Sequence, residues 1–146
     1  MKLTTIALIG AATLSAGFAH ADSHEASIGD VVQAALDAGD AEKGEKVFRK
    51  CKACHQVGEG AAARVGPPLN NILGAPLGTS EEFSYSDNVI VMRDDGITWT
   101  TENLDLYLIR PRDFIEGSRM TFPGLRKEED RADVIAYLAT LTEVSE

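Results

Sequence analysis

Two cysteines three positions apart, with a histidine directly after the second, constrain this chain more than any other feature. The motif reads Cys51-Lys52-Ala53-Cys54-His55, and this spacing is the attachment signature of c-type haem. Side chains at i and i+3 of a helical turn project from the same face, so both thiols reach one porphyrin edge and its vinyl groups. The imidazole of His55 is then placed to bind the iron as an axial ligand. The sequence therefore predicts one covalently bound haem c.

A redox disulfide and a zinc site are the alternatives for this cysteine pair. A thioredoxin-like pair requires a surrounding βαβ pattern, and the sequence shows no such alternation. A structural zinc site requires four ligands. Cys51 and Cys54 are the only cysteines, and the other histidines, His20 and His24, lie near the N-terminus. Haem attachment is the favoured interpretation.

Length and charge limit the size of the fold and the kind of partner. The 146 residues are enough for one modest domain. The formal net charge is -9, so general nucleic-acid binding is not expected. Because small domains bury a limited core, we expect a flat and largely apolar haem to supply much of the interior.

Residues 1–21 have the pattern of a secretory signal peptide. Lys2 supplies positive charge, residues 3–14 are mainly apolar or small, and Ala19-His20-Ala21 offers a small-x-small cleavage site. An uncleaved membrane anchor is the alternative, but the apolar run is short and rich in small residues. We expect cleavage, a periplasmic location and no membrane span in the mature chain.

The remaining chain divides into an acidic N-terminal extension (22–39), one domain (40–142) and a C-terminal tail (143–146). In the extension we expect a partly ordered segment with one or two amphipathic turns over residues 28–36. The domain is expected to contain a helix that starts after the N-cap Asp40 and leads into the haem motif.

Further helices are predicted after the haem motif, and long irregular segments separate them. Residues 70–96 are read as a long loop with one helical turn around 87–91. Thr100 is the expected N-cap of the next helix, and Pro111 is expected to stop it before an irregular stretch over 112–125. The last helix is expected from about Lys127 to Leu141. No segment shows a convincing strand pattern.

The sixth ligand of the iron distinguishes an electron carrier from an enzyme or a sensor. After cleavage, the soft or imidazole donors besides His55 are His24, Met92 and Met120. His24 lies in the extension, and Met92 follows β-branched residues and is read as a packing residue. Met120 lies in a loop whose Pro and Gly residues can hold a fixed curve, so it is the predicted ligand. A His/Met pair raises the potential of a haem and leaves no open coordination site.

A rigid turn follows the motif at Gly66-Pro67-Pro68. A metal-bound histidine commonly donates its other ring N–H to a backbone carbonyl. Pro67 is a candidate for this acceptor, because proline fixes local geometry and leaves its carbonyl free. An ordinary loop turn is the alternative.

These landmarks resemble those of class I c-type cytochromes, of the mitochondrial cytochrome c and bacterial cytochrome c2 type, over about residues 40–141. The resemblance implies an all-α cytochrome c fold of three to five helices around one haem, with the Gly44 helix crossing the C-terminal helix. It implies that Tyr85 and Trp99 hydrogen-bond a haem propionate and that Tyr107 lies near the Met120 sulfur. The matching segments are Gly44 and Phe48, the haem motif, Gly66-Pro67 with Leu69, 83–85, 96–99, 107–108, Pro111, 118–122 and 133–138.

Three departures accompany the resemblance. Ala75 stands where many family members have an arginine near the propionates, and Pro68 replaces a common asparagine. The segment between Tyr85 and Gly96 is a few residues longer than in the mitochondrial form. The consequence of Ala75 for the propionates is left open.

Basic residues concentrate in two segments of this acidic chain. Residues 43–64 carry a net charge of +4 and residues 110–127 carry +3. Because these segments hold the haem motif and Met120, we expect a basic rim around an exposed haem edge that orients the molecule toward redox partners. Ordinary solvated charge without such clustering is the alternative.

The sequence thus predicts a monomeric one-electron carrier rather than an enzyme. The resemblance implies a quinol-oxidising cytochrome bc complex as donor, and a terminal oxidase, a photosynthetic reaction centre or a periplasmic reductase as acceptor. A haem peroxidase and a gas or redox sensor are the alternatives, and both would need an open distal site.

Overall fold

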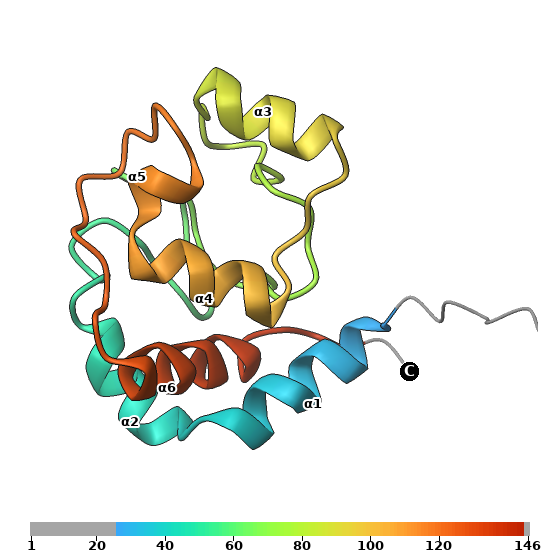
Figure 1. Cartoon of the computed structure of the whole chain (residues 1–146), viewed down its shortest axis with the longest axis vertical. Helices are drawn as coiled ribbons and strands as arrows, with labels where there is room; N and C mark the ends of the chain where they lie inside the picture. The colour runs from blue at the N-terminus through green and yellow to red at the C-terminus, as the bar shows by residue number, and fades with distance from the viewer. Residues whose placement is uncertain (1–25, 145–146) are drawn as a thin grey trace, which may run out of the picture.

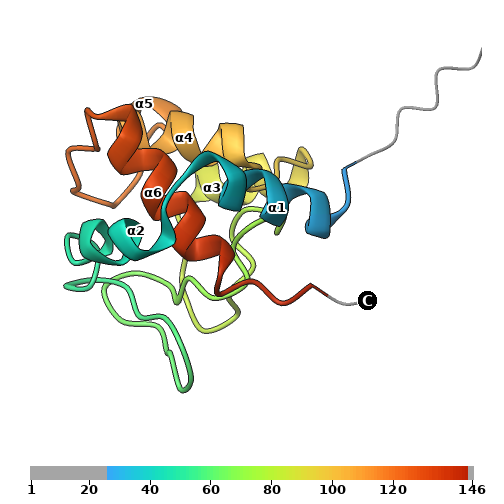
Figure 2. The ribbon, with the colours of Figure 1, turned by 90° about the horizontal axis from the view of Figure 1, so that it is seen from below.

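The computed structural model describes residues 26–144, in which six helices make up the regular structure (Figures 1 and 2). Within these residues the only β-type pairing is an isolated antiparallel bridge between Pro76 and Thr98. The all-α class is confirmed, with one helix more than the three to five expected. The helices are α1 (Ile28–Ala38), α2 (Ala41–Phe48), α3 (Asp87–Asp94), α4 (Thr101–Ile109), α5 (Pro111–Phe114) and α6 (Glu128–Ala139).

Two helices begin at the N-caps expected from the sequence. A carboxylate oxygen of Asp40 accepts hydrogen bonds from the backbone N–H groups of Glu42 and Lys43, at 3.0 and 3.1 Å. The hydroxyl of Thr100 accepts one from the N–H of Asn103 at 3.1 Å. Each cap satisfies donors that the first helical turn leaves without a partner.

The contact between α2 and α6 is the most extensive helix pair of the fold, and Figure 2 shows α6 running across α2 and α1. A Cβ on Gly44 would lie 1.9 Å from the backbone oxygen of Asp133, so only glycine permits this approach. The rings of Phe48 and Tyr137 pack beside the crossing with centroids 5.4 Å apart. The crossing that the resemblance implied is therefore present.

The described part of the N-terminal extension, residues 26–39, contains a longer helix than expected. Its predicted one or two turns form the 11-residue helix α1, closed at its start by a capping box between Ser27 and Asp30. Val32 and Ala35 are buried, and α1 packs against α6 and contacts α4. The expectation of only one or two turns was too small, because the apolar face of α1 packs against α6, a partner surface that the local pattern does not reveal.

Pro111 does not open an irregular stretch. The helix α4 ends at Ile109, and Pro111 is the first residue of the short helix α5. Proline is favoured at this position, because its fixed φ suits a helix start and the first N–H needs no helical partner. The prediction of an irregular stretch over 112–125 was therefore wrong for its first three residues, and the remainder, up to α6, contains no helix.

The predicted signal peptide (1–21) and His24 lie outside the described residues, as do the last two residues of the predicted tail. Among the helices of residues 26–144, none combines the length and the apolar character needed to cross a membrane.

Candidate haem site

The haem motif continues from the end of α2 as a further helical turn. The N–H of Cys51 donates to the carbonyl of Phe48 at 2.8 Å, and the N–H groups of Cys54 and His55 donate to the carbonyl of Cys51 at 3.0 and 2.9 Å. The two cysteines thus lie one turn apart, as the spacing predicts. Both are free thiols and partly buried.

The environment of Cys51 disfavours a thiolate. Burial raises the pKa of this thiol to about 11, and the nearby Lys50 offsets only part of the effect. Reactive cysteines of redox disulfides have a lowered pKa instead. Cys51 therefore does not have the lowered pKa that is typical of the attacking cysteine of a redox disulfide.

The imidazole of His55 is oriented by the turn that follows the motif. Its Nδ1 lies 2.8 Å from the carbonyl oxygen of Pro67. A carbonyl only accepts, so Nδ1 carries the hydrogen and Nε2 is left with the lone pair that binds a metal. Burial lowers the pKa of His55, with the Pro67 contact acting in the opposite sense, and a lowered pKa favours the neutral, metal-binding form.

Gly66 is a site residue whose role the sequence reasoning missed. A Cβ at this position would lie 2.4 to 2.8 Å from three atoms of the His55 ring. The N–H of Gly66 also donates to the carbonyl of Cys54 at 3.0 Å. The backbone at Gly66 therefore lies so close to the imidazole that no side chain fits between them. The sequence signal that could have indicated this is the glycine directly before Pro67-Pro68.

The thioether of Met120 has a hydrogen-bond donor of its own. The hydroxyl of Tyr107 on α4 lies 3.4 Å from the Met120 sulfur and donates to it. Burial raises the pKa of Tyr107 to about 12, so the phenol keeps its proton at neutral pH. The hydroxyl of Ser118 accepts from the N–H of Met120 at 3.3 Å. Tyr107 and Ser118 together fix the position of the methionine.

Three aromatic rings form a cluster behind Met120. Ring centroids of Trp99 and Tyr107 lie 5.0 Å apart, and those of Tyr107 and Phe114 lie 5.9 Å apart. Trp99 is buried, and its ring stacks on Phe114 at 6.2 Å. Such a cluster would supply an apolar, rigid surround that excludes water from a haem bound beside Met120.

Tyr85 makes its contacts with residues other than those of the aromatic cluster. Its hydroxyl accepts a hydrogen bond from the N–H of Ser80 at 3.3 Å, and its ring meets Phe83 edge-on at 4.9 Å. It lines a cavity of about 380 Å³ together with Arg93. The predicted roles of Tyr85 and Trp99 toward a haem propionate stay predictions.

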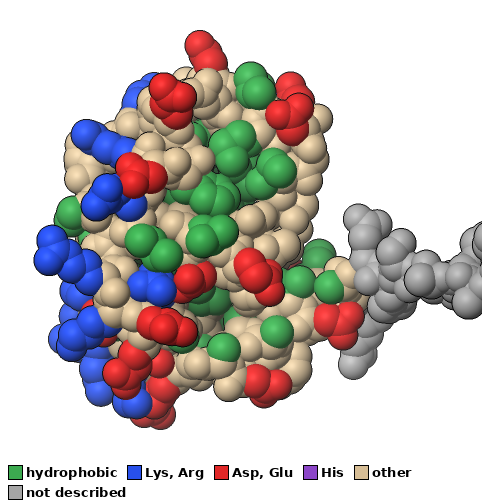
Figure 3. All heavy atoms as spheres, viewed as in Figure 1, with side chains coloured by type: hydrophobic (Ala, Val, Ile, Leu, Met, Phe, Trp, Pro, Cys, Tyr) green, Lys and Arg blue, Asp and Glu red, His purple; other side chains and the backbone are tan. Residues whose placement is uncertain are grey.

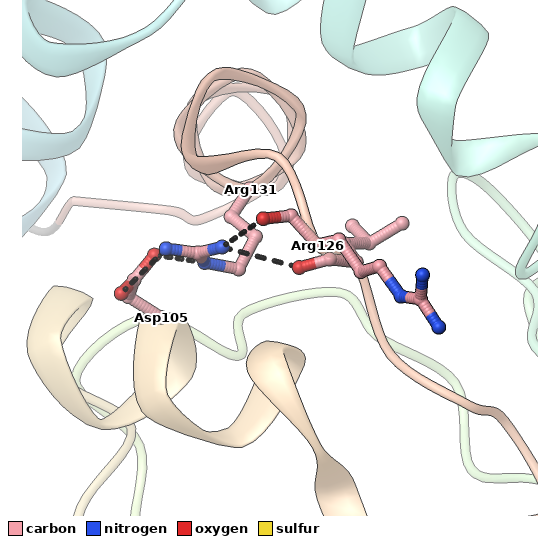
Figure 4. Close-up of polar contacts among 4 residues, drawn as sticks. Asp105, Arg126 and Arg131 are labelled. Atoms are coloured by element: carbon pink, nitrogen blue, oxygen red, sulfur yellow. Dashed lines mark hydrogen bonds and ion pairs between the residues drawn. The ribbon is translucent and has the colours of Figure 1, made fainter.

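A buried arginine anchors the chain downstream of Met120 (Figure 4). Arg131 of α6 is 7% exposed, and its Nε donates to the Oδ1 of Asp105 on α4 at 2.6 Å. Its Nη1 donates to the carbonyl oxygens of Leu125 and Arg126, at 3.1 and 3.3 Å. One cation therefore joins α4, α6 and the end of the segment that carries Met120, a role that no local pattern indicated.

The residues present fit a covalent haem. Two free thiols lie one helical turn apart, and the imidazole after them has Nε2 available. A hydrogen-bonded thioether is held beside an aromatic cluster. These residues, in an all-helical fold, define a protein that attaches a haem through two cysteines.

The comparisons with known proteins agree with this assignment. The sequence profile of the cytochrome c family matches residues 41–142. The chain is 43% identical to cytochrome c2 of Rhodomicrobium vannielii over 140 residues, covering 96% of this chain and 97% of that one. It is 48% identical to cytochrome c-550 of Ancylobacter novellus over 98 residues, 67% of this chain and 92% of the relative.

A solved structure shares the fold. Cytochrome c2 from Rhodospirillum centenum superposes with a TM-score of 0.67 at 39% identity, covering 72% of this chain and all of that one. The chain belongs to the cytochrome c family. It is accordingly an electron carrier with one covalent haem c, and not an enzyme.

Proposed function

We propose that this protein is a periplasmic, soluble, monomeric one-electron carrier whose haem iron is bound by His55 and Met120. Cys51 and Cys54 form the two thioether links. When bound, haem c supplies reversible one-electron chemistry between Fe(II) and Fe(III). The polypeptide contributes the ligands, a water-poor surround and a surface for partner proteins.

The observation that carries the ligand assignment is the hydrogen bond from Tyr107 to the Met120 sulfur. A donor on one lone pair orients the thioether and leaves the other lone pair for a metal. The carbonyl of Pro67 likewise holds the His55 ring through Nδ1 and leaves Nε2 for a metal. Two preoriented donors favour a closed, six-coordinate site over the open distal site that a peroxidase or a gas sensor needs.

The test replaces each candidate methionine in the haem-loaded protein. Met120→Ala is expected to abolish the thioether-to-iron absorption band and to lower the midpoint potential by on the order of 0.1 V, within the ~0.8 V range that axial ligands set. The haem is expected to stay attached through Cys51 and Cys54. Met92→Ala is the matched control: Met92 packs against the core, so its loss should cost stability but keep the band and the potential.

Two results would contradict the assignment. A band that survives in Met120→Ala and disappears in Met92→Ala would identify Met92 as the ligand. Rapid binding of carbon monoxide by the unaltered reduced protein at neutral pH would favour an open site and hence the sensor or peroxidase alternative.

The proposed partners are a quinol-oxidising cytochrome bc complex as donor and a terminal oxidase, a reaction centre or a periplasmic reductase as acceptor. Lys and Arg side chains gather along the edge formed by α2, α5 and the segment between α5 and α6, whereas acidic side chains are scattered over the rest of the visible face among hydrophobic ones (Figure 3). Such an edge attracts an acidic partner and accelerates encounter.

Not every basic residue of the two segments is available for docking. Lys50 pairs with Asp130 at 3.3 Å, and Arg119 donates to the carbonyl of Ser84. Lys52 and Lys127 are exposed. Reversing Lys52 and Lys127 to Glu should slow electron transfer with an acidic partner, most strongly at low ionic strength, with little change in potential. Reversing the exposed Glu143 to Lys is the control, and rates that ignore salt would refute the electrostatic docking.

A further inference from the structure

The loop that carries Met120 is anchored unevenly along its length. Upstream, Pro111 and Ile115 are buried. Downstream, the N–H of Leu125 donates to the carbonyl of Leu108 at 2.7 Å, and Arg131 binds the Leu125 carbonyl. Between these anchors, residues 116–124 contain no buried residue. What holds this middle stretch therefore bears directly on the position of Met120.

Two side-chain hydrogen bonds connect the middle stretch to the segment around the start of α3. The amide Nδ2 of Asn88 donates to the carbonyl oxygen of Glu116 at 2.6 Å. The guanidinium of Arg119 donates to the carbonyl of Ser84. These bonds flank Ser118, whose hydroxyl accepts from the N–H of Met120. Residues 84–88 are thus linked to Glu116 and Arg119, which lie four positions and one position before Met120.

The contact of Asn88 with the loop is close and specific. A Cβ added to Gly117 would find the Asn88 Nδ2 at 3.6 Å and no other atom within 4 Å. Gly117 has a φ of +72°, which glycine adopts without strain. The loop therefore turns at Gly117 directly against the Asn88 amide. In Figure 1 the segment that follows α5 comes close to the start of α3, in agreement with the Asn88–Glu116 hydrogen bond.

We propose that Asn88 is a positioning residue for Met120. Its amide holds the Glu116–Gly117 turn in place. The Met120 side chain can then move away from the iron only when this hydrogen bond breaks. The proposal rests on the assignment of Met120 as axial ligand. Asn88 lies in the first turn of α3 and is exposed, so this contact is a side-chain bond at the surface and not part of the packed core.

Imidazole is a suitable probe, because it can bind the ferric iron only after the methionine has left. In the haem-loaded protein, Asn88→Ala is expected to raise the rate of imidazole binding about fivefold, the factor that corresponds to ~1 kcal/mol for one hydrogen bond. Hydrogen exchange of the amides of residues 116–120 should accelerate by a similar factor, which gives a second readout that does not depend on the iron.

Asn88→Asp separates positioning from general stability. The carboxylate has the same shape but cannot donate to a carbonyl. It also lies in the first turn of α3, where negative charge is favourable, so overall stability should be kept. Imidazole binding is nevertheless expected to accelerate as in Asn88→Ala.

Asn103→Ala is the matched control. Asn103 also donates its Nδ2 to a backbone carbonyl, that of Thr98 at 2.8 Å, and its hydrogen bonds go to the start of α4 instead of the Met120 loop. Its loss should lower stability and leave imidazole binding within twofold of the unaltered protein. Rates within twofold in both Asn88 variants would overturn the proposal. Met120→Ala, measured in the same series, distinguishes failure of this proposal from failure of the ligand assignment. An intact methionine band in Met120→Ala would overturn the ligand assignment.

Discussion

The two proposed axial donors, His55 and Met120, lie in regions that are held together in different ways. His55 follows α2, which crosses α6 by direct backbone contact at Gly44, and seven residues of α6 are buried. Met120 lies in a loop that faces α3, and α3 has no buried residue. Helix packing therefore secures the side of the covalent attachment, whereas individual hydrogen bonds secure the side of the methionine.

This difference has a physical consequence for dynamics. Segments with few buried apolar contacts open at a lower free-energy cost than the global unfolding of the domain. The methionine side is therefore expected to open locally while the α2–α6 crossing stays intact. A covalent haem tolerates such opening, because the thioether links keep it in place when the sixth ligand leaves.

The largest expected effect comes from disturbing the packed side at Gly44. In Gly44→Ala the new Cβ would overlap the Asp133 carbonyl, a backbone atom that cannot move without shifting α6. We expect a loss of about 3 kcal/mol in the free energy of unfolding, measured by denaturant titration of the haem-loaded protein with circular dichroism.

Gly29→Ala in α1 is the control for this substitution. A Cβ there would lie 3.4 Å from a Val144 methyl, an ordinary contact. Because alanine favours helix more than glycine does, no loss is expected. Equal losses of stability in the two variants would mean that the close α2–α6 crossing does not contribute to stability more than an ordinary helix position. The claim that helix packing secures this region would then be wrong.

An intermediate effect is expected from Arg131, which joins the packed helices to the end of the Met120 loop. Arg131→Met leaves the Asp105 carboxylate without its partner and the carbonyls of Leu125 and Arg126 without a donor (Figure 4). We expect a loss of about 2 kcal/mol in the free energy of unfolding. The same denaturant titration measures it.

Arg110→Met provides the comparison for Arg131. Arg110 pairs with Asp113 at 3.1 Å, but both side chains are about two-thirds exposed. Exposed pairs contribute little, so a loss below about 0.5 kcal/mol is expected. If the two arginine variants were equally stable, the buried ion pair would not be an anchor of the loop.

The smallest effect is a pH dependence at the start of α2. The N–H of Lys43 donates to the Asp40 carboxylate, and this hydrogen bond is the main cause of a pKa below the ordinary value of 3.8. Because the folded pKa is lowered, the stabilisation is present above pH 3.8 and is lost as pH falls through the folded value.

Asp40→Asn tests this contribution, since asparagine also caps helices but does not titrate in the acid range. Stability near pH 7 should change little, and the decline of stability below about pH 4 should become shallower. Acid unfolding curves measure the difference. If the stability of the variant declines as steeply with falling pH as that of the unaltered protein, Asp40 does not contribute to acid stability.

Features that depend on neighbouring residues were predictable from sequence. The spacing of Cys51 and Cys54 places two thiols on one helical turn, because the helical repeat sets side-chain direction. Asp40 and Thr100 cap their helices through atoms two or three residues away. The assignments of His55 and Met120 rest on donor chemistry and on resemblance.

Contacts between distant segments were not predictable in the same way. The partners Arg131 and Asp105 are 26 residues apart, and Asn88 and Glu116 are 28 apart. In the sequence, these positions look like ordinary solvated polar residues. Their exposure and their partners depend on how the loops fold back. The order of α1 has the same origin: an 11-residue amphipathic helix is marginal alone, and packing against α6 stabilises it.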